Sequence, residues 1–190
     1  YLKNSTILGG AYFSDKNLEI IGGSIDLKGF VSANGWPASS LFHQPYTDRD
    51  IRNKLENSNV EIMLEHEFIS LDQNQESVSF KTINLNNQEE KDFTSRYLIG
   101  SDGGSSIVRK QLGISQEDLN YNRDWVVIDV ELNEPDKLGD KLIQVCDKER
   151  LATFVPSHLP FRRWEFIIHE HEDKESFLDD KTIHELIDKW

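Results

Sequence analysis

The second half of the chain has short apolar-rich runs separated by polar residues, which predicts a series of β-strands. These runs cover residues 125–132, 142–146, 152–155 and 164–168. Earlier β-rich runs cover residues 60–64, 67–71, 78–83 and 93–95, with a polar hairpin tip between the last two. The short spacing between the runs is typical of antiparallel sheet, so we expect most strands to pair with neighbours in the sequence.

The opening residues also favour strands. Gly22-Gly23 lies between residues 19–21 and 24–30, which predicts a hairpin turn at the two glycines. A first helix is expected to begin with Thr47 as its N-cap, with Asp50 three residues later, and to run to about residue 57. A last helix is predicted for residues 181–190, where apolar side chains recur on one stripe.

A strand–turn–helix unit is predicted at residues 97–113. The apolar run 97–100 is expected to form a buried strand with Asp102 at its C-terminal tip. Gly103 and Gly104 follow, and a helix then ends before Gly113, a typical C′ residue. One such unit between stretches of antiparallel sheet predicts an α+β, or mixed α/β, fold rather than a doubly wound domain. A soft domain boundary is expected at residues 115–122.

The net charge and the cysteine count of the chain argue against several classes of binding partner. The chain has 190 residues and a formal net charge of -13, from 34 acidic and 21 basic residues. A surface this negative repels phosphate backbones and anionic lipid, so we expect neither a nucleic-acid nor a membrane partner. The single cysteine, Cys146, excludes an intrachain disulfide and fits a reducing compartment. We therefore expect a cytoplasmic globular protein.

The turn at Asp102 has the strongest site-like pattern. Ligands of open α/β sheets bind beyond the carboxyl ends of strands, and a carboxylate there accepts hydrogen bonds from sugar-type hydroxyls. Gly103 and Gly104 let a ligand approach the backbone, and the start of the helix offers free N–H donors. The alternative is a plain connection in which Asp102 only caps the helix. The spacing alone leaves both interpretations open.

Residues 97–109, with the sequence YLIGSDGGSSIVR, resemble the Asp-Gly motif of the class A flavoprotein aromatic hydroxylases, the para-hydroxybenzoate hydroxylase family. The motif residues Asp102, Gly103, Ser106, Val108 and Arg109 match, whereas Ser105 stands where the family usually has Arg. The segments GWP (35–37), FHQP (42–45), QVCD (144–147), ATFVP (152–156) and RRWEF (162–166) follow in the family's order. They resemble most the 3-(3-hydroxyphenyl)propionate hydroxylase branch.

The resemblance implies an FAD-dependent, NAD(P)H-using monooxygenase that hydroxylates a phenolic aromatic substrate. By family position, Asp102 and Gly103 would meet the ribitol of FAD, Gln44 its ribityl chain, and the backbone of Phe68 its adenine. The cofactor carries the difficult chemistry, so neither a catalytic side chain nor a metal site is implied. Full-length relatives are often dimers, which makes a homodimer possible.

The resemblance also implies a domain arrangement. Residues 1–34 would be strands of the substrate domain or an inter-domain region, and 35–115 part of the FAD-binding α/β layer. Residues 116–190 would be a truncated, largely antiparallel β-sheet substrate domain. The chain opens without Met, closes inside a predicted helix and has no Gly-x-Gly-x-x-Gly turn for the pyrophosphate. We therefore expect an internal fragment that binds FAD poorly and is inactive alone.

Two further clusters invite a functional interpretation. His169 and His171 would lie on one face of a strand, which suggests a metal, but no third ligand is evident. Arg162 and Arg163 suit a substrate carboxylate, although adjacent arginines are more often surface pairs.

Rival interpretations of the whole chain are a related flavoprotein epoxidase, an antibiotic or polyketide hydroxylase, and a non-catalytic β-rich binding domain. The RRWEF segment favours the phenolic hydroxylase among the flavoproteins.

Overall fold

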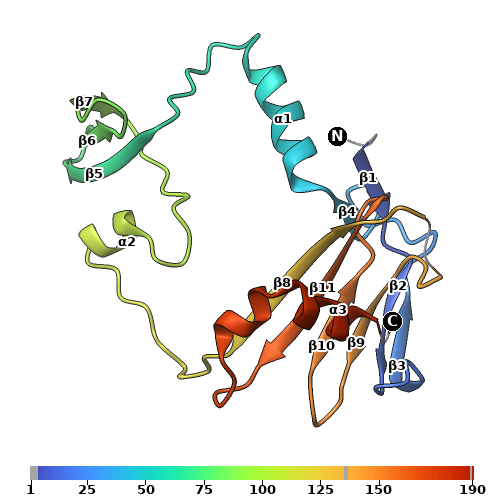
Figure 1. Ribbon diagram of the computed structural model, residues 1–190. Coiled ribbons are helices and arrows are strands. Elements are labelled where there is room, and N and C mark those ends of the chain that lie inside the picture. The colour runs from blue at the N-terminus through green and yellow to red at the C-terminus, as the bar shows by residue number, and fades with distance from the viewer. Residues whose placement is uncertain (1–3, 135–136, 189) are drawn as a thin grey trace. The chain divides into compact units, whose positions relative to one another are not determined.

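The computed structural model describes residues 4–134, 137–188 and 190. By contact, the chain divides into two compact units (Figure 1). The larger contains the chain up to Ser58 and from Asn122 onward, and the smaller spans Asn59–Tyr121. The chain thus leaves the larger unit after α1 and returns to it before β8. The assignment of residues 1–34, 35–115 and 116–190 to particular domains stays a prediction.

The larger unit is built on a six-stranded sheet, with the order β3-β2-β9-β10-β11-β8 within the described residues. Its strands are β2 (Gly10–Ser14), β3 (Ile20–Asp26), β8 (Asp124–Glu131), β9 (Lys141–Val145), β10 (Ala152–Val155) and β11 (Phe161–Ile168). All neighbours are antiparallel except β2 and β9, which are parallel. Such mixed sheets, with few helices in the described chain, confirm the predicted α+β class.

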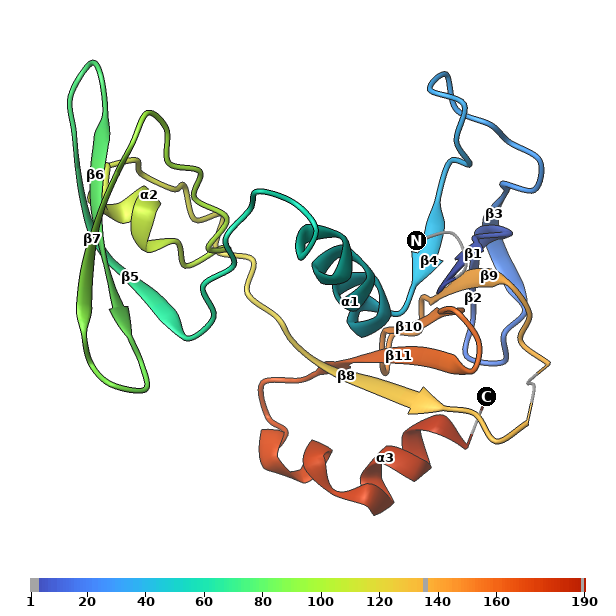
Figure 2. The ribbon, with the colours of Figure 1, turned by 90° about the horizontal axis from the view of Figure 1, so that it is seen from above.

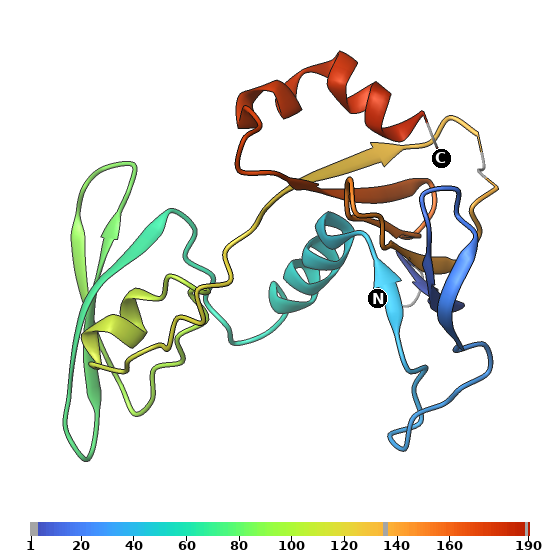
Figure 3. The ribbon, with the colours of Figure 1, turned by 90° about the horizontal axis from the view of Figure 1, so that it is seen from below.

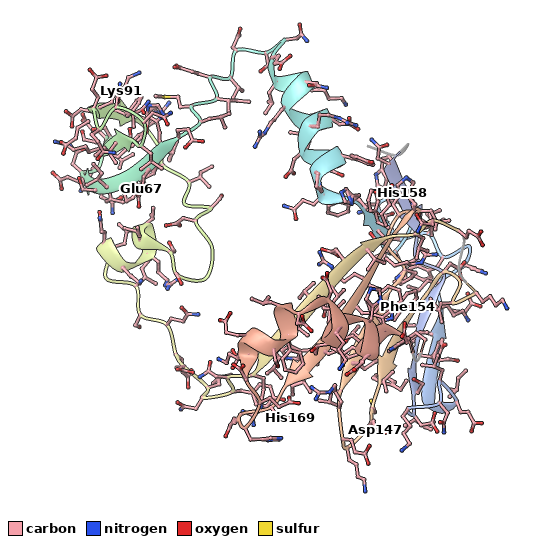
Figure 4. The ribbon with its side chains drawn as sticks, viewed as in Figure 1. Glu67, Lys91, Asp147, Phe154, His158 and His169 are labelled. Atoms are coloured by element: carbon pink, nitrogen blue, oxygen red, sulfur yellow. The ribbon has the colours of Figure 1, made fainter. Side chains whose placement is uncertain are left out.

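One face of this sheet is the hydrophobic core. Ile143, Phe154, Trp164 and Ile128 stand directly opposite one another across β9, β10, β11 and β8, and each is at most 6% exposed. Phe154, labelled in Figure 4, is fully buried. Helix α3 (Asp180–Ile187) covers this face with the apolar stripe that the sequence predicts, and Ile183, Leu186 and Ile187 pack against the cluster.

Helix α1 (Gln44–Leu55) lies on the opposite side of the sheet from α3. Figures 2 and 3 show α3 and α1 on opposite sides of β8 and β11. A short antiparallel pair, β1 (Ser5–Ile7) and β4 (Ser40–Phe42), leads the chain into α1, and Asn4 Nδ2 donates to Asp50 Oδ2 at 2.7 Å. None of the helices in the described part of the chain has the length and apolar character needed to cross a bilayer.

The smaller unit is an antiparallel meander with one short helix. Strands β5 (His66–Gln73), β6 (Val78–Asn84) and β7 (Glu90–Ser95) pair in sequence order, and Phe80 stacks on Phe93 with ring centroids 5.0 Å apart. Helix α2 (Ile107–Gln111) is joined to the edge strand β5 by Gln111. The Gln111 amide donates to Ile69 O at 2.6 Å and accepts from Leu71 N at 2.9 Å. This one side chain therefore replaces a missing strand neighbour at the β5 edge.

The predicted hairpin at Gly22-Gly23 is wrong, because β3 runs through both glycines without a turn. The chain reverses earlier, where the Asp15 carboxylate accepts from the backbone N–H groups of Asn17 and Glu19. A Cβ on Gly22 would lie 3.3 Å from the Cβ of Phe13 on the paired strand. Glycine is used here for a close approach between strands rather than for a turn.

Two other local predictions are also wrong. Helix α1 begins at Gln44 rather than after Thr47, because Pro45 fits the first turn of a helix, and Thr47 is buried inside that turn. Residues 60–64 form no strand, and Val60, Ile62 and Leu64 are exposed. β-propensity without a partner strand does not make a strand.

A part-buried ion pair joins the β9–β10 hairpin to the segment after β11. Arg150 Nη1 donates to Ile167 O at 2.6 Å and to Glu172 Oε2 at 3.1 Å, and its Nη2 also contacts Glu172. The backbone N–H of His169 donates to Glu172 at 2.7 Å. These hydrogen bonds, with that from Arg150 the largest cause, lower the pKa of Glu172 from 4.5 to about 2. The pair precedes η2 (Lys174–Leu178), whose Phe177 lies under the guanidinium.

Replacing Glu172 with Gln should lower the free energy of unfolding by about 1–2 kcal/mol at neutral pH. Because the folded pKa is depressed, this stabilisation is complete above about pH 4.5 and is lost as the pH falls toward 2. Urea unfolding at several pH values measures the difference, with the exposed Glu175→Gln as control. A difference between Glu172→Gln and wild type that stays constant down to pH 2 would contradict this account.

Replacing Gln111 with Ala should loosen the β5 edge without unfolding the meander. Two hydrogen bonds are lost, each contributing on the order of 1 kcal/mol, so exchange of the Leu71 amide should accelerate about tenfold or more. Hydrogen exchange followed by NMR measures this, and Lys110→Ala, one residue away on α2, is the matched control. Equal Leu71 rates in the two variants would show that Gln111 does not hold this edge.

Candidate functional site

Asp102 organises the turn before α2 with its carboxylate. Oδ1 accepts from Ser106 Oγ at 2.6 Å, and Oδ2 accepts from the backbone N–H groups of Ile107 and Val108 at 2.7 and 3.1 Å. The hydrogen bond from Ser106, followed by that from Val108 N, lowers the pKa of Asp102. Ser106 itself caps α2 by accepting from Arg109 N. The carboxylate is therefore ionised and fixed in direction.

Asp102 does hold the start of α2, as the capping interpretation expected, and this changes how a ligand would bind. The N–H groups at the helix start, which the sequence suggested for a ligand, are used by Asp102 itself. An ionised carboxylate has about four acceptor positions, of which three are filled here. One acceptor position remains, which fits a single hydroxyl of a polyol.

Gly103 gives the turn the room that such a polyol needs. Its φ is +75°, a conformation that favours glycine, and no atom lies within 4 Å of the place where a Cβ would stand. Gly104 is similarly open. The turn at Asp102 and Gly103 therefore combines one free acceptor with an uncovered backbone.

The apolar run before this turn is not a strand, which corrects the sequence-based expectation. Residues 97–100 pair with no strand in the described chain, and Tyr97 and Ile99 are 78% and 85% exposed. A buried strand needs hydrogen-bond partners on its edges, and the neighbouring meander ends at β7. Gly100 is still packed closely, because a Cβ there would lie 3.1 Å from Val108.

Phe68 lies on β5, the edge strand that Gln111 joins to α2. The register of β5 with β6 shifts between Phe68 and Ser70, as at a β-bulge, and Phe68 is half-buried. Phe68 thus shares the smaller unit with Asp102 and Gly103. The adenine contact of Phe68 stays a prediction.

Gln44 stands at the first position of α1, in the larger unit. It lines a hollow of about 550 Å³ bounded by β4, the start of α1 and the outward faces of β8, β10 and β11. His43, Asp129, Phe161 and Arg163 also line this hollow. The volume is within the range of small-molecule pockets. The polar side chains that converge here come from both ends of the sequence.

Arg163 and Arg162 have different environments, although they are adjacent. Arg163 makes a two-pronged ion pair with Asp129, with Nε and Nη2 each 2.8 Å from a carboxylate oxygen. The hydrogen bond from Asp129 raises the pKa of Arg163. Arg162 is 6% exposed and donates to the carbonyl of Ser157 at 2.9 Å on the core side. Of the two, only Arg163 lines the hollow.

His169 and His171 stack with ring centroids 5.6 Å apart, beyond the end of β11. His169 Nε2 lies 2.8 Å from the carbonyl of Glu149, which can only accept, so this nitrogen carries the hydrogen. The described residues contain no group of three or more His, Cys, Asp or Glu side chains that could hold a metal. Nothing in their surroundings adds a third ligand to the pair.

His43 and the Asp129–Arg163 pair were not singled out together from the sequence. They meet because Arg163 and Asp129 are direct cross-strand partners, a register that no local pattern shows. The local signal for His43 was Pro45, which marks the start of α1 and places His43 at its N-cap. Had Pro45 been assigned to the first turn of the helix, the sequence would have placed His43 and Gln44 at the start of α1, where they line the hollow.

Comparison with known proteins identifies the family. The FAD binding domain family matches residues 14–190. The 3-(3-hydroxy-phenyl)propionate/3-hydroxycinnamic acid hydroxylase of Comamonas testosteroni is 31% identical over 159 residues, covering 82% of this chain and 26% of that protein. The Burkholderia cenocepacia protein of the same name is 29% identical over 163 residues, covering 85% and 30%. The chain thus spans under a third of these curated relatives.

Solved structures agree on the fold. The flavin-dependent monooxygenase PieE, in complex with FAD and substrate, matches with a TM-score of 0.75 at 18% identity, covering 96% of this chain and 34% of that one. The p-nitrophenol 4-monooxygenase PnpA from Pseudomonas putida matches with a TM-score of 0.75 at 16% identity, covering 99% and 46%. With the family match over nearly the whole sequence, the chain belongs to the FAD binding domain family.

Proposed function

We propose that the chain is part of an FAD-dependent, NAD(P)H-using monooxygenase that hydroxylates a phenolic aromatic acid. The observation that carries the proposal is the turn at Asp102 and Gly103, with an ionised carboxylate that keeps one acceptor free beside an open backbone. The names of the two curated relatives support phenylpropionate- or hydroxycinnamate-type substrates rather than an epoxidation or a polyketide.

Each predicted contact residue has a distinct part in this proposal. Asp102 and Gly103 would hold the ribitol of FAD, Gln44 would lie along its ribityl chain, and the edge of β5 at Phe68 would meet the adenine. FAD, when bound, supplies the redox chemistry that takes electrons from NAD(P)H and activates O₂. The residues of this chain position the cofactor and exclude water around the substrate.

The hollow beside Gln44 would receive the aromatic substrate. Phe161 and His43 give it aromatic walls, and Arg163 gives it hydrogen-bond donors. Because Asp129 already pairs with Arg163, a substrate carboxylate gains less from this arginine than from a free one. We therefore assign Arg163 to the phenolic oxygen of the substrate rather than to its carboxylate. A homodimer of the full-length protein also stays a prediction.

Replacing Asp102 with Ala in the full-length protein should weaken FAD binding by about tenfold or more, because a charged hydrogen-bond acceptor for the ribitol is lost. The wild type should oxidise NAD(P)H faster when 3-(3-hydroxyphenyl)propionate or 3-hydroxycinnamate is added. FAD content after gel filtration and NAD(P)H absorbance measure the two effects.

Ser106→Ala is the matched control for this experiment. It removes a hydrogen bond to Asp102 and the cap of α2 but keeps the carboxylate, so it should retain most of the FAD. Equal FAD affinity in Asp102→Ala and wild type would remove Asp102 from the cofactor site. If no phenolic acid stimulates NAD(P)H oxidation by the wild type, the proposed function is wrong.

A further inference from the structure

His43 occupies an N-cap position without capping the helix. Ser, Thr, Asp and Asn are preferred there because their side chains accept from the first free N–H groups. The side chain of His43 makes no such hydrogen bond. Its ring instead stacks on Phe161, with centroids 3.8 Å apart and planes at 25°, and lies 4.8 Å from the ring of Tyr46. Departures from local rules are expected at functional positions.

The stack on Phe161 contacts the face of the His43 ring, so the ring nitrogens at its edge stay accessible to a ligand. Neither ring nitrogen has a hydrogen-bond partner in the described part of the chain, and the residue is half-buried in the wall of the hollow. An imidazole held in this way keeps a fixed direction while a nitrogen stays free for a ligand. Histidine is also the side chain best suited to exchange protons near neutral pH.

Among the described residues that line the hollow, Arg163 is the cation that can donate to a substrate oxygen. The charged and titratable groups around His43 are Tyr46 and Asp48 on α1, Asp129 on β8 and Arg163 on β11, while β4 and β10 contribute none. Asp129 uses two of the five donors of Arg163 and fixes its direction. The remaining donors stay available to a substrate oxygen.

We propose that His43 is the general base that accepts the phenolic proton of the substrate, an inference that rests on the proposed function. In this step the O–H bond of the phenol breaks, its proton joins a ring nitrogen of His43, and the electron pair stays on the oxygen. The products are a phenolate, which accepts hydrogen bonds from Arg163, and an imidazolium, which later releases its proton to solvent. No oxidant enters this step. The phenolate is the more electron-rich ring, so oxygen transfer to its carbon is easier.

The test compares His43→Phe with wild type in the full-length, FAD-loaded protein. Phenylalanine keeps the stack on Phe161 but has no nitrogen, so kcat at pH 7 should fall by about 10²-fold, a typical general-base contribution. KM should change little. The loss should shrink as the pH approaches about 10, the ordinary pKa of a phenol, because the substrate then ionises without a base. His43→Gln, which also lacks a proton-accepting nitrogen, should behave in the same way.

A second readout follows the proton directly. The ultraviolet absorbance of 3-hydroxycinnamate bound to the wild type should show the phenolate band near neutral pH, and in His43→Phe the band should appear only near the phenol's own pKa. His184→Phe, at an exposed position on α3, is the control and should match the wild type. An unchanged pH profile and phenolate band in His43→Phe, with an active wild type, would overturn this inference alone. A wild type without phenol-stimulated NAD(P)H oxidation would overturn the proposed function as well.

Discussion

The alternation of side chains along β10 and β11 is the constraint on which the larger unit depends. Successive side chains of a strand point to opposite faces of the sheet. Phe154 and Trp164 point into the core that α3 covers. The next residues on the other face, including Arg163, then have to point toward α1. The division of the sheet into a packed side and a side with the hollow follows from this alternation rather than from any single polar contact.

Each unit has a charged side chain whose direction is fixed by hydrogen bonds within that unit. Asp102 uses most of its hydrogen-bonding capacity to hold its own turn, which makes it rigid but leaves a free acceptor. Arg163 is likewise held by Asp129 while keeping donors free. In both cases an internal hydrogen bond fixes the direction of a charged group, which is how polar sites become preorganised.

The sequence predicted well those elements whose pattern is local. Strands β8 to β11, the end of α2 before Gly113 and the apolar stripe of α3 lie close to where periodicity and glycine placed them. Predictions failed where a distant partner decides the outcome. Residues 97–100 and 60–64 have strand-like composition but lie in none of the strands of the described residues, and Gly22 serves the packing of Phe13 rather than a turn. The Arg163–Asp129 pair depends on register, which composition does not encode.

A crystal structure of the full-length protein with FAD and a phenolic acid tests the central claim most directly. The account predicts that the phenolic oxygen lies within hydrogen-bond distance, about 2.7–3.2 Å, of Arg163 and a nitrogen of His43, on the α1 side of the sheet. It also predicts a ribitol hydroxyl at Asp102. A substrate bound on the α3 side, or a hollow filled by other protein side chains, would contradict the account.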